Sequence, residues 1–282
     1  MVNESPDTPP RRKLRPTRRG RLALLVAAVL VLVVAAAVLV PLLTRERSTE
    51  RTRSLVIPEG WRASQVYAAV DKVLDEPSGT TEKAVAAAGL PLPPSAKGNP
   101  EGYLFPATYP VTSDTTPQSL LRYMVDTAVK RFGADHITTG AQRNGVTVYQ
   151  TVAIASIVQA EADTGPDMGK VARVVHNRLA RDMPLQMDST LNYALNRSTL
   201  DTTAGDTKID SPYNSYEHKG LPPTPIGNPG EQAMAAAISP TAGPWLYFVT
   251  VAPGDTRFTA DYAQQQRNVE EFNRNRRGAG NG

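Results

Sequence analysis

The sequence predicts an α+β fold in which helices pack on a mostly antiparallel sheet. Several segments repeat apolar residues at intervals of three and four, which is the spacing of an amphipathic helix. Residues 245–251 are instead rich in β-branched and aromatic residues, which are typical of a strand. The 24 prolines among the 282 residues indicate that long ordered loops connect these elements.

An uncharged run at residues 22–43 predicts a transmembrane helix. Its 22 residues would span roughly 33 Å at about 1.5 Å per residue, close to the thickness of a bilayer core. Seven basic residues precede the run, whereas four follow it and are diluted by two glutamates. The positive-inside rule therefore places residues 1–21 in the cytoplasm and residues 44–282 outside. A cleaved signal peptide is the alternative, but its apolar region is usually about 7–15 residues long.

The predicted location outside the cytoplasm and the distribution of charge restrict the classes of ligand to be expected. The net charge of +4 divides into +7 over residues 1–53 and −3 over residues 54–282, so nucleic acid is not an expected partner. Outside the cytoplasm, ATP and NAD are poor candidates, whereas cell wall, lipid headgroups and secreted proteins are good ones. The sequence has no cysteine and three scattered histidines, and it holds neither a Walker loop nor a G-x-G-x-x-G motif. We therefore expect no metal site and no cofactor.

The part after the membrane run divides into a linker, a small module and a larger domain. Residues 44–54 are a polar linker, and residues 55–98 predict a small αβ module that opens with a short strand. A helix over residues 63–73 places three valines on one face, and an alanine-rich helix follows at residues 81–90. Prolines and glycines between residues 91 and 100 then mark a boundary.

Residues 99–273 predict the main domain, and residues 274–282 predict a disordered tail. The domain opens with an aromatic extended stretch at residues 101–111. Thr147 and Gln150 have the spacing of a capping box, which predicts a helix start. The remaining predicted elements are helices at about 117–132, 147–162, 169–182, 229–238 and 260–273, and a strand at 245–251.

Glu161 is the charged residue whose position is most informative. It follows Ile157 and Val158 by four and three positions, so it continues the buried side of an apolar helix. Desolvation raises a carboxyl pKa, as does the negative end of a helix dipole, and a proton donor near neutral pH needs such a raised pKa. The alternative is a structural carboxylate that pairs with Arg173 or Arg178, or is solvated at a frayed helix end.

The proline-rich stretch at residues 183–230 concentrates polar side chains. Its amides, carboxylate and tyrosines are of the types that bind sugars through hydrogen bonds and ring stacking. The candidate sugar-binding residues are Gln186, Asp188, Tyr213, Asn214, Tyr216 and Asn228. The alternative is a long structural loop packed on the domain. His218 is a weaker candidate for a catalytic base, because lone histidines are usually structural.

Five segments, taken in order, resemble the endolytic murein transglycosylases of the MltG, or YceG-like, family. They cover residues 100–272 and read EGYLFPATYPV, ASIVQAEA, VVHNRLARDMPLQMDST, SPYNSYEHKGLPPTPIGNPG and WLYFVTVAPGDTRF. The family motif that ASIVQAEA resembles carries the catalytic glutamate at the position of Glu161, and Gln159 stands where a second acid is frequent. Residues 55–98 resemble a shortened form of the family's LysM-like region, and Thr224 stands where a glycine is frequent.

The resemblance implies a membrane-anchored lytic transglycosylase, a carbon–oxygen lyase that cleaves the MurNAc–GlcNAc bond of nascent peptidoglycan. Glu161 would serve as acid and then as base, which leaves a 1,6-anhydro-MurNAc end and terminates glycan elongation. The implied partners are glycan strands, the membrane and peptidoglycan synthases of the elongation or division machinery. The implied site is a groove between the Glu161 helix and the 183–230 stretch.

Two other functions stay open at this point. A glycoside hydrolase would use Asp188 as nucleophile or base beside Glu161, because such enzymes normally work with two carboxylates. A non-catalytic scaffold of the wall-synthesis complex would instead bind partner proteins through its loops.

Overall fold

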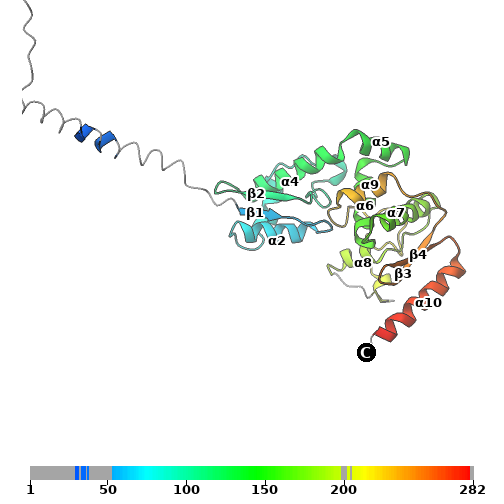
Figure 1. The fold of residues 1–282 in the computed structure, drawn as a ribbon. Helices are drawn as coiled ribbons and strands as arrows, with labels where there is room; N and C mark the ends of the chain where they lie inside the picture. The colour runs from blue at the N-terminus through cyan, green and yellow to red at the C-terminus, as the bar shows by residue number, and fades with distance from the viewer. Residues whose placement is uncertain are drawn as a thin grey trace, which may run out of the picture. The chain divides into compact units, whose positions relative to one another are not determined.

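The structure, a computed structural model, describes residues 29–31, 33–35, 37, 53–197, 202–203 and 205–279. Residues 52–282 form one compact unit, and residues 1–51 are counted apart from it (Figure 1). Most of the predicted membrane run at 22–43 lies outside the described residues, as do the basic tail and most of the linker. Where the chain is described, no helix is both long and apolar enough to cross a bilayer.

A two-stranded antiparallel sheet joins the small N-terminal module to the main domain. Strand β1 (Arg53–Val56) pairs with β2 (Thr108–Val111), and Leu55 lies opposite Tyr109. Both of these side chains are buried, while their neighbours along each strand are exposed, as in a sheet with one face on the core. Because β2 lies beyond the boundary expected at residue 98, the two predicted regions share this sheet.

The predicted helix of the small module is present as helix α2 (Ala63–Val73), which buries Val66 and Val70 against the core. The alanine-rich segment after it forms a short helix, α3 (Thr80–Ala84), and a single 3₁₀ turn, η1 (Val85–Ala87). A second 3₁₀ turn, η2 (Pro94–Ala96), interrupts the proline-rich connection to β2.

Helices make up most of the main domain, and two of them start within one residue of their predicted starts. Helix α4 (Pro117–Phe132) follows the N-cap Thr116, and α6 (Val148–Glu161) follows the predicted capping box at Thr147. In that box the Gln150 backbone N–H donates to Thr147 Oγ1 at 3.1 Å, and the Thr147 N–H donates to Gln150 Oε1 at 2.8 Å. Helix α5 (Asp135–Arg143), which lies between them, was not predicted.

Helix α7 (Gly165–Ala180) begins four residues before its predicted start. Gly165 and Pro166 are its first residues, and proline fits the first turn of a helix because its missing N–H costs nothing there. Thr164 caps the helix by accepting a hydrogen bond from the Asp167 N–H at 3.3 Å. The next predicted helix is α9 (Glu231–Ile238).

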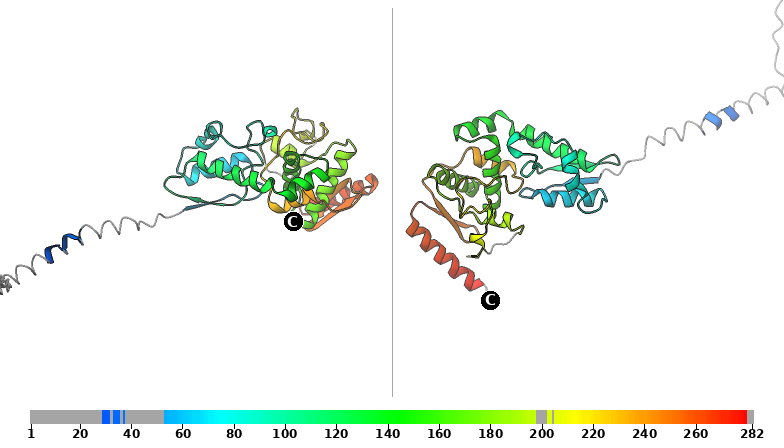
Figure 2. Two further views of the ribbon diagram at one scale, coloured as in Figure 1. Left: turned by 90° about the horizontal axis from the view of Figure 1, so that it is seen from above. Right: turned by 180° about the vertical axis from the view of Figure 1, so that it is seen from behind.

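Helix α6 lies at the centre of the main domain. Every residue from Thr151 to Val158 is buried, so the helix is enclosed on all sides rather than on one face. Helices α5, α7 and α9 pack against it, together with a short helix that was not predicted, α8 (Asp188–Ala194) (Figure 2). Because α6 is packed on all sides, its last residue, Glu161, has a fixed position.

The C-terminal part is a hairpin covered by a helix. Strand β3 (Tyr247–Ala252) pairs antiparallel with β4 (Asp255–Thr259), and α10 (Tyr262–Ala279) packs on β3. The prediction of a disordered tail from residue 274 is wrong up to residue 279, because the helix continues and Asn275 Nδ2 donates to Val251 O at 2.9 Å. The strands described here form two separate pairs, and the core of the main domain is helical rather than a sheet.

Candidate active site

Glu161 is the last residue of α6, and its partly buried side chain faces the start of α8. The Ser189 backbone N–H donates to Glu161 Oε1 at 3.2 Å. Within the described residues Glu161 makes no ion pair. The alternative in which Glu161 pairs with Arg173 or Arg178 therefore fails. Arg173 donates to the backbone oxygens of Pro240 and Thr241. Arg178 donates to those of Leu185 and Leu246.

The surroundings of Glu161 favour its protonated form. Burial raises the pKa of the Glu161 carboxyl, and the negative charge of Asp188 raises it further. The hydroxyl and N–H of Ser189 act in the opposite direction, because they stabilise the carboxylate, but burial dominates. A raised carboxyl pKa is what a general acid needs in order to hold its proton near neutral pH.

Two of the predicted sugar-binding residues, Asp188 and Tyr216, meet beside Glu161. The Tyr216 hydroxyl donates to Asp188 Oδ1 at 2.5 Å. Burial raises the pKa of the Tyr216 hydroxyl, and its bond to Asp188 acts in the same direction. Asp188 and Tyr216 are both partly exposed, so a ligand bound at Glu161 could contact them.

Ser215 locks this arrangement in place. Its buried hydroxyl accepts a hydrogen bond from the Met187 N–H at 2.9 Å and lies 2.8 Å from Thr190 Oγ1. Its carbonyl accepts from the Gln186 N–H at 2.9 Å. The loop that carries Tyr216 is thereby fixed to the first turn of α8, which carries Asp188 and Ser189.

Gln186 is exposed and adopts a left-handed backbone conformation with φ of 51°, and its Oε1 accepts from Arg178 Nη1 at 3.1 Å. Arg178 itself is buried on α7, and burial lowers its pKa. Its guanidinium also donates to the backbone oxygens of Leu185 at 2.8 Å and Leu246 at 2.6 Å. Arg178 therefore holds the segment before α8, and Gln186 stands at the margin of the site.

Tyr213 lies beside the last turn of α8. Its ring packs on Tyr193 with a centroid distance of 4.9 Å, and its hydroxyl lies 2.9 Å from Thr224 Oγ1. Thr224, which departs from the family's frequent glycine, thus has a specific contact. Tyr213 is partly exposed, so a sugar-stacking role stays a prediction for it.

Asn214 and Asn228 are fully buried, and the prediction that they contact substrate is corrected by this geometry. Asn214 Nδ2 donates to the backbone oxygens of Thr207 and Ile209. Asn228 Nδ2 donates to Trp61 O at 2.7 Å, and its Oδ1 accepts from the Leu104 N–H at 2.8 Å. Amides suit sugars and backbone equally well, and composition alone does not separate the two uses.

The sequence reading missed Ser189 and Tyr193 because α8 is seven residues long and sits inside a proline-rich stretch. It also missed Glu101, a buried carboxylate that begins the aromatic segment EGYLF. The sequence pattern that could have pointed to Glu101 is its charged side chain next to the apolar segment GYLF. The hydroxyl of Ser189 is buried close to the Glu161 carboxyl, whose pKa it lowers.

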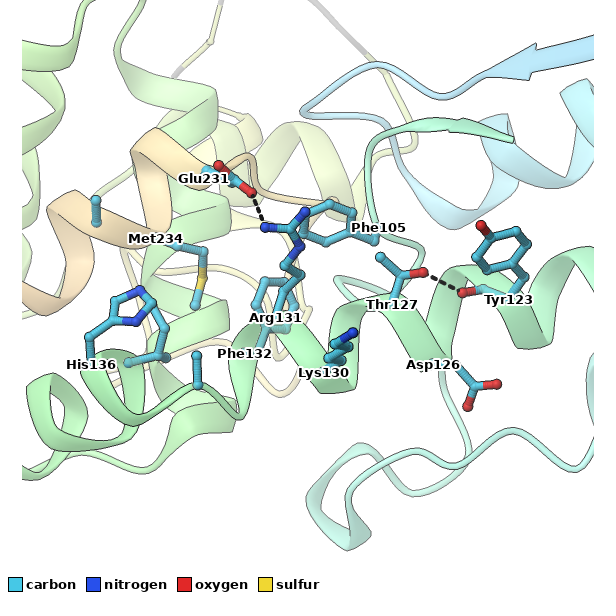
Figure 3. A pocket seen from close by; sticks show the side chains of 13 residues that line it. Phe105, Tyr123, Asp126, Thr127, Lys130, Arg131, Phe132, His136, Glu231 and Met234 are labelled. Atoms are coloured by element: carbon cyan, nitrogen blue, oxygen red, sulfur yellow. Dashed lines mark hydrogen bonds and ion pairs between the residues drawn. The ribbon is translucent and has the colours of Figure 1, made fainter. Parts of the chain in front are cut away.

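A cavity of about 940 Å³ lies away from these residues, between α4, α5 and α9 (Figure 3). Phe105, Phe132 and Met234 line it, as do Arg131 and Glu231, which form an ion pair at 3.1 Å. None of the predicted site residues lines this cavity, so it does not mark the site around Glu161.

Comparison with known proteins relates the chain to peptidoglycan enzymes. The YceG-like family matches residues 34–271. An endolytic murein transglycosylase of Bacillus subtilis is 35% identical over 176 residues, which are 61% of this chain and 48% of that protein. One from Streptococcus pneumoniae D39 is 38% identical over 177 residues, 61% of this chain and 32% of that protein. The matched region thus spans half or less of these relatives.

A crystal structure of a YceG-like protein from Listeria monocytogenes has a similar fold. It superimposes with a TM-score of 0.64 at 29% sequence identity, over 77% of this chain and 75% of that protein.

Proposed function

The chain belongs to the YceG-like family, and from this premise we propose that it is a membrane-anchored endolytic lytic transglycosylase acting on nascent peptidoglycan. The observation that carries the proposal is the state of Glu161. Its carboxyl has a raised pKa, makes no ion pair with any described residue, and is held by the N–H of Ser189 beside partly exposed Asp188 and Tyr216. A lone acid of this kind suits a reaction that needs one group to donate and then recover a proton.

The proposed reaction balances with this single carboxyl. Protonated Glu161 donates its proton to the glycosidic oxygen that follows a MurNAc unit, and the C1–O bond breaks. The C6 hydroxyl of the same sugar then attacks C1 and gives its proton to the Glu161 carboxylate. The acid is regenerated, no water is consumed, and the new end is 1,6-anhydro-MurNAc. In this proposal Tyr216, Asp188 and Gln186 orient the sugar.

A second candidate is a glycoside hydrolase in which Asp188 acts as base or nucleophile. The observation in its favour is that the charge of Asp188 reaches Glu161, so the two carboxyls lie near each other. Against it, the Asp188 carboxylate is engaged by the Tyr216 hydroxyl. The two reactions differ in their products, because hydrolysis leaves a reducing MurNAc end.

Digestion of purified peptidoglycan by the full chain, with mass spectrometry of the ends, tests the proposal. We expect anhydro-MurNAc ends from internal cuts, and reducing ends in their place would overturn it. Glu161→Gln removes the proton donor with little change of shape and should abolish cleavage. Glu82→Gln, an exposed glutamate on α3, is the matched control and should cleave normally. A Glu161→Gln variant that fully complements a deletion strain would instead support the scaffold function.

The anchored location is also a proposal, supported by the uncharged run at residues 22–43 and its flanking charges. In this arrangement the N-terminus is cytoplasmic and residues 52–282 act on glycan strands outside, near the synthases that make them. A C-terminal alkaline phosphatase fusion should be active. An inactive fusion, with an active β-galactosidase fusion at the same position, would reverse the orientation.

A further inference from the structure

Glu101 is a buried carboxyl that the proposed reaction does not use. Only 4% of its surface is exposed. Its Oε1 accepts a hydrogen bond from the Ala63 N–H at 3.0 Å, at the first residue of α2, and its Oε2 accepts from the Tyr193 hydroxyl at 3.0 Å. The carboxyl therefore connects the N-terminal module to helix α8.

Helix α8 carries both the contact to Glu161 and the contact to Glu101. Ser189 and Tyr193 are four residues apart, so they project from the same side of the helix, one turn from each other. Ser189 in the first turn donates to Glu161, and Tyr193 in the last turn donates to Glu101. Any shift of this short helix would be transmitted directly to the N–H on Glu161.

Arg62 supports the same end of α8. Its Nη2 donates to Arg197 O at 2.8 Å, just beyond the helix, and its guanidinium lies 5.2 Å from the centroid of the Tyr193 ring. Arg62 is the N-cap residue of α2, next to the Ala63 that binds Glu101. Ser215 fixes the first turn of α8, whereas Arg62, Glu101 and Tyr193 fix its last turn.

We propose that Glu101 is a positioning residue for the reaction, which holds α8 through Tyr193 and thereby keeps the Ser189 N–H on Glu161. The small N-terminal module then contributes to the catalytic site, because its residues Arg62 and Ala63 bind Arg197 and Glu101 at the end of α8. The inference rests on the proposed role of Glu161 as the acid. The coupling between α8 and the Glu161 carboxyl can, however, be measured without the reaction.

Three variants test the coupling in the full chain. Tyr193→Phe removes the hydroxyl that binds Glu101, and Glu101→Ala removes the carboxyl. Glu101→Gln keeps an oxygen for the Ala63 N–H and an amide for Tyr193, so it should rescue. Asp71→Ala is the matched control, since Asp71 is also 4% exposed and caps the start of α3 through Gly79 and Thr81, away from α8.

The first readout is the rate of cleavage. We expect Tyr193→Phe and Glu101→Ala to lower kcat about tenfold with little change in KM, because the acid is misplaced while the substrate still binds. The alkaline limb of the pH profile should move to higher pH, since a weakened Ser189 N–H contact lets the Glu161 pKa rise. Glu101→Gln and Asp71→Ala should keep the wild-type kcat and pH limb.

The second readout does not depend on activity. Carbon-13 labelling of glutamate carboxyls gives a titration curve for Glu161, which Glu161→Gln identifies by loss of its resonance. The midpoint should rise in Tyr193→Phe and Glu101→Ala alone. Wild-type midpoints and kcat in both variants, or the same changes in Asp71→Ala, would overturn the inference. Cleavage by Glu161→Gln would refute the proposed function, while the titration would still decide whether α8 couples to Glu161.

Discussion

The backbone N–H of Ser189 donates to Oε1 of Glu161 at 3.2 Å, which brings the start of α8 against the end of α6. The two residues are 28 positions apart, and the contact is possible because Ser215 fixes the first turn of α8 beside Tyr216. It gives the carboxyl a defined orientation without neutralising it, since no basic side chain among the described residues pairs with it.

Loss of the Glu161 proton donor should remove most of the activity. A positioned general acid contributes roughly 10²–10⁴-fold to the rate, so Glu161→Gln should lower kcat by about that factor. The amide retains an oxygen for the Ser189 N–H, and the circular dichroism spectrum should not change. Rates of anhydro-muropeptide formation measure the effect, and a loss of less than tenfold would contradict the assignment.

Asp188→Asn should move the alkaline limb of the pH profile to lower pH. The negative charge of Asp188 raises the pKa of Glu161, and its removal lowers that pKa. Because the reaction needs protonated Glu161, activity then declines at a lower pH than in the wild type. The profile of kcat/KM against pH is the measurement. Complete loss of activity at every pH would instead indicate that Asp188 reacts directly, as in a hydrolase.

Ser189→Ala isolates the contribution of the buried hydroxyl. The backbone N–H stays in place, whereas the hydroxyl, which also lowers the pKa of Glu161, is gone. The alkaline limb should therefore move to higher pH, opposite to Asp188→Asn. The hydroxyl acts on this one carboxyl, so its removal should change the melting temperature little. A large fall in melting temperature would show that it makes a hidden structural bond.

Asn228→Ala should destabilise the fold without changing how the folded fraction binds substrate. It leaves the Leu104 N–H without its buried acceptor, at a cost of about 1–3 kcal/mol. The Trp61 carbonyl loses the side-chain donor but keeps the backbone N–H of residue 228 at 2.8 Å. Urea unfolding measures the loss, and KM at a temperature where the variant is folded measures binding. A raised KM with unchanged stability would restore the predicted role of Asn228 in substrate binding.

Glu101 should make the protein less stable as pH rises. Burial raises the pKa of its carboxyl from 4.5 to about 7. Between these values the folded chain holds a proton that the unfolded chain has released. The stabilisation is therefore complete below about pH 4.5 and disappears through pH 7, an effect on the order of 3 kcal/mol. Unfolding free energies at pH 5 and pH 8 should differ more in the wild type than in Glu101→Gln, and equal differences would contradict this.

Much of the fold follows from local patterns in the sequence. The capping box at Thr147 and the apolar spacing after it predict α6, and the same spacing predicts α2 and α4 with their observed bounds. These features depend on hydrogen bonds and contacts between residues three or four positions apart, which a short window of sequence contains. The start of α7 differs from the prediction because Pro166 fits the first turn of a helix capped by Thr164. The helical residues after 273 were not predicted, because Asn275 gains a partner, Val251, that lies elsewhere in the sequence.

The sequence by itself determined the place of Glu161, on the last turn of an apolar helix in a motif of the YceG-like family. Tertiary structure alone decided which polar residues surround it. Asn214 and Asn228 have the same chemistry as Gln186, yet packing buries the first two against the backbone and leaves the third exposed. Glu101, 60 positions before Glu161, reaches it only through α8. Such relationships arise when distant segments pack together, and no local pattern of residues encodes them.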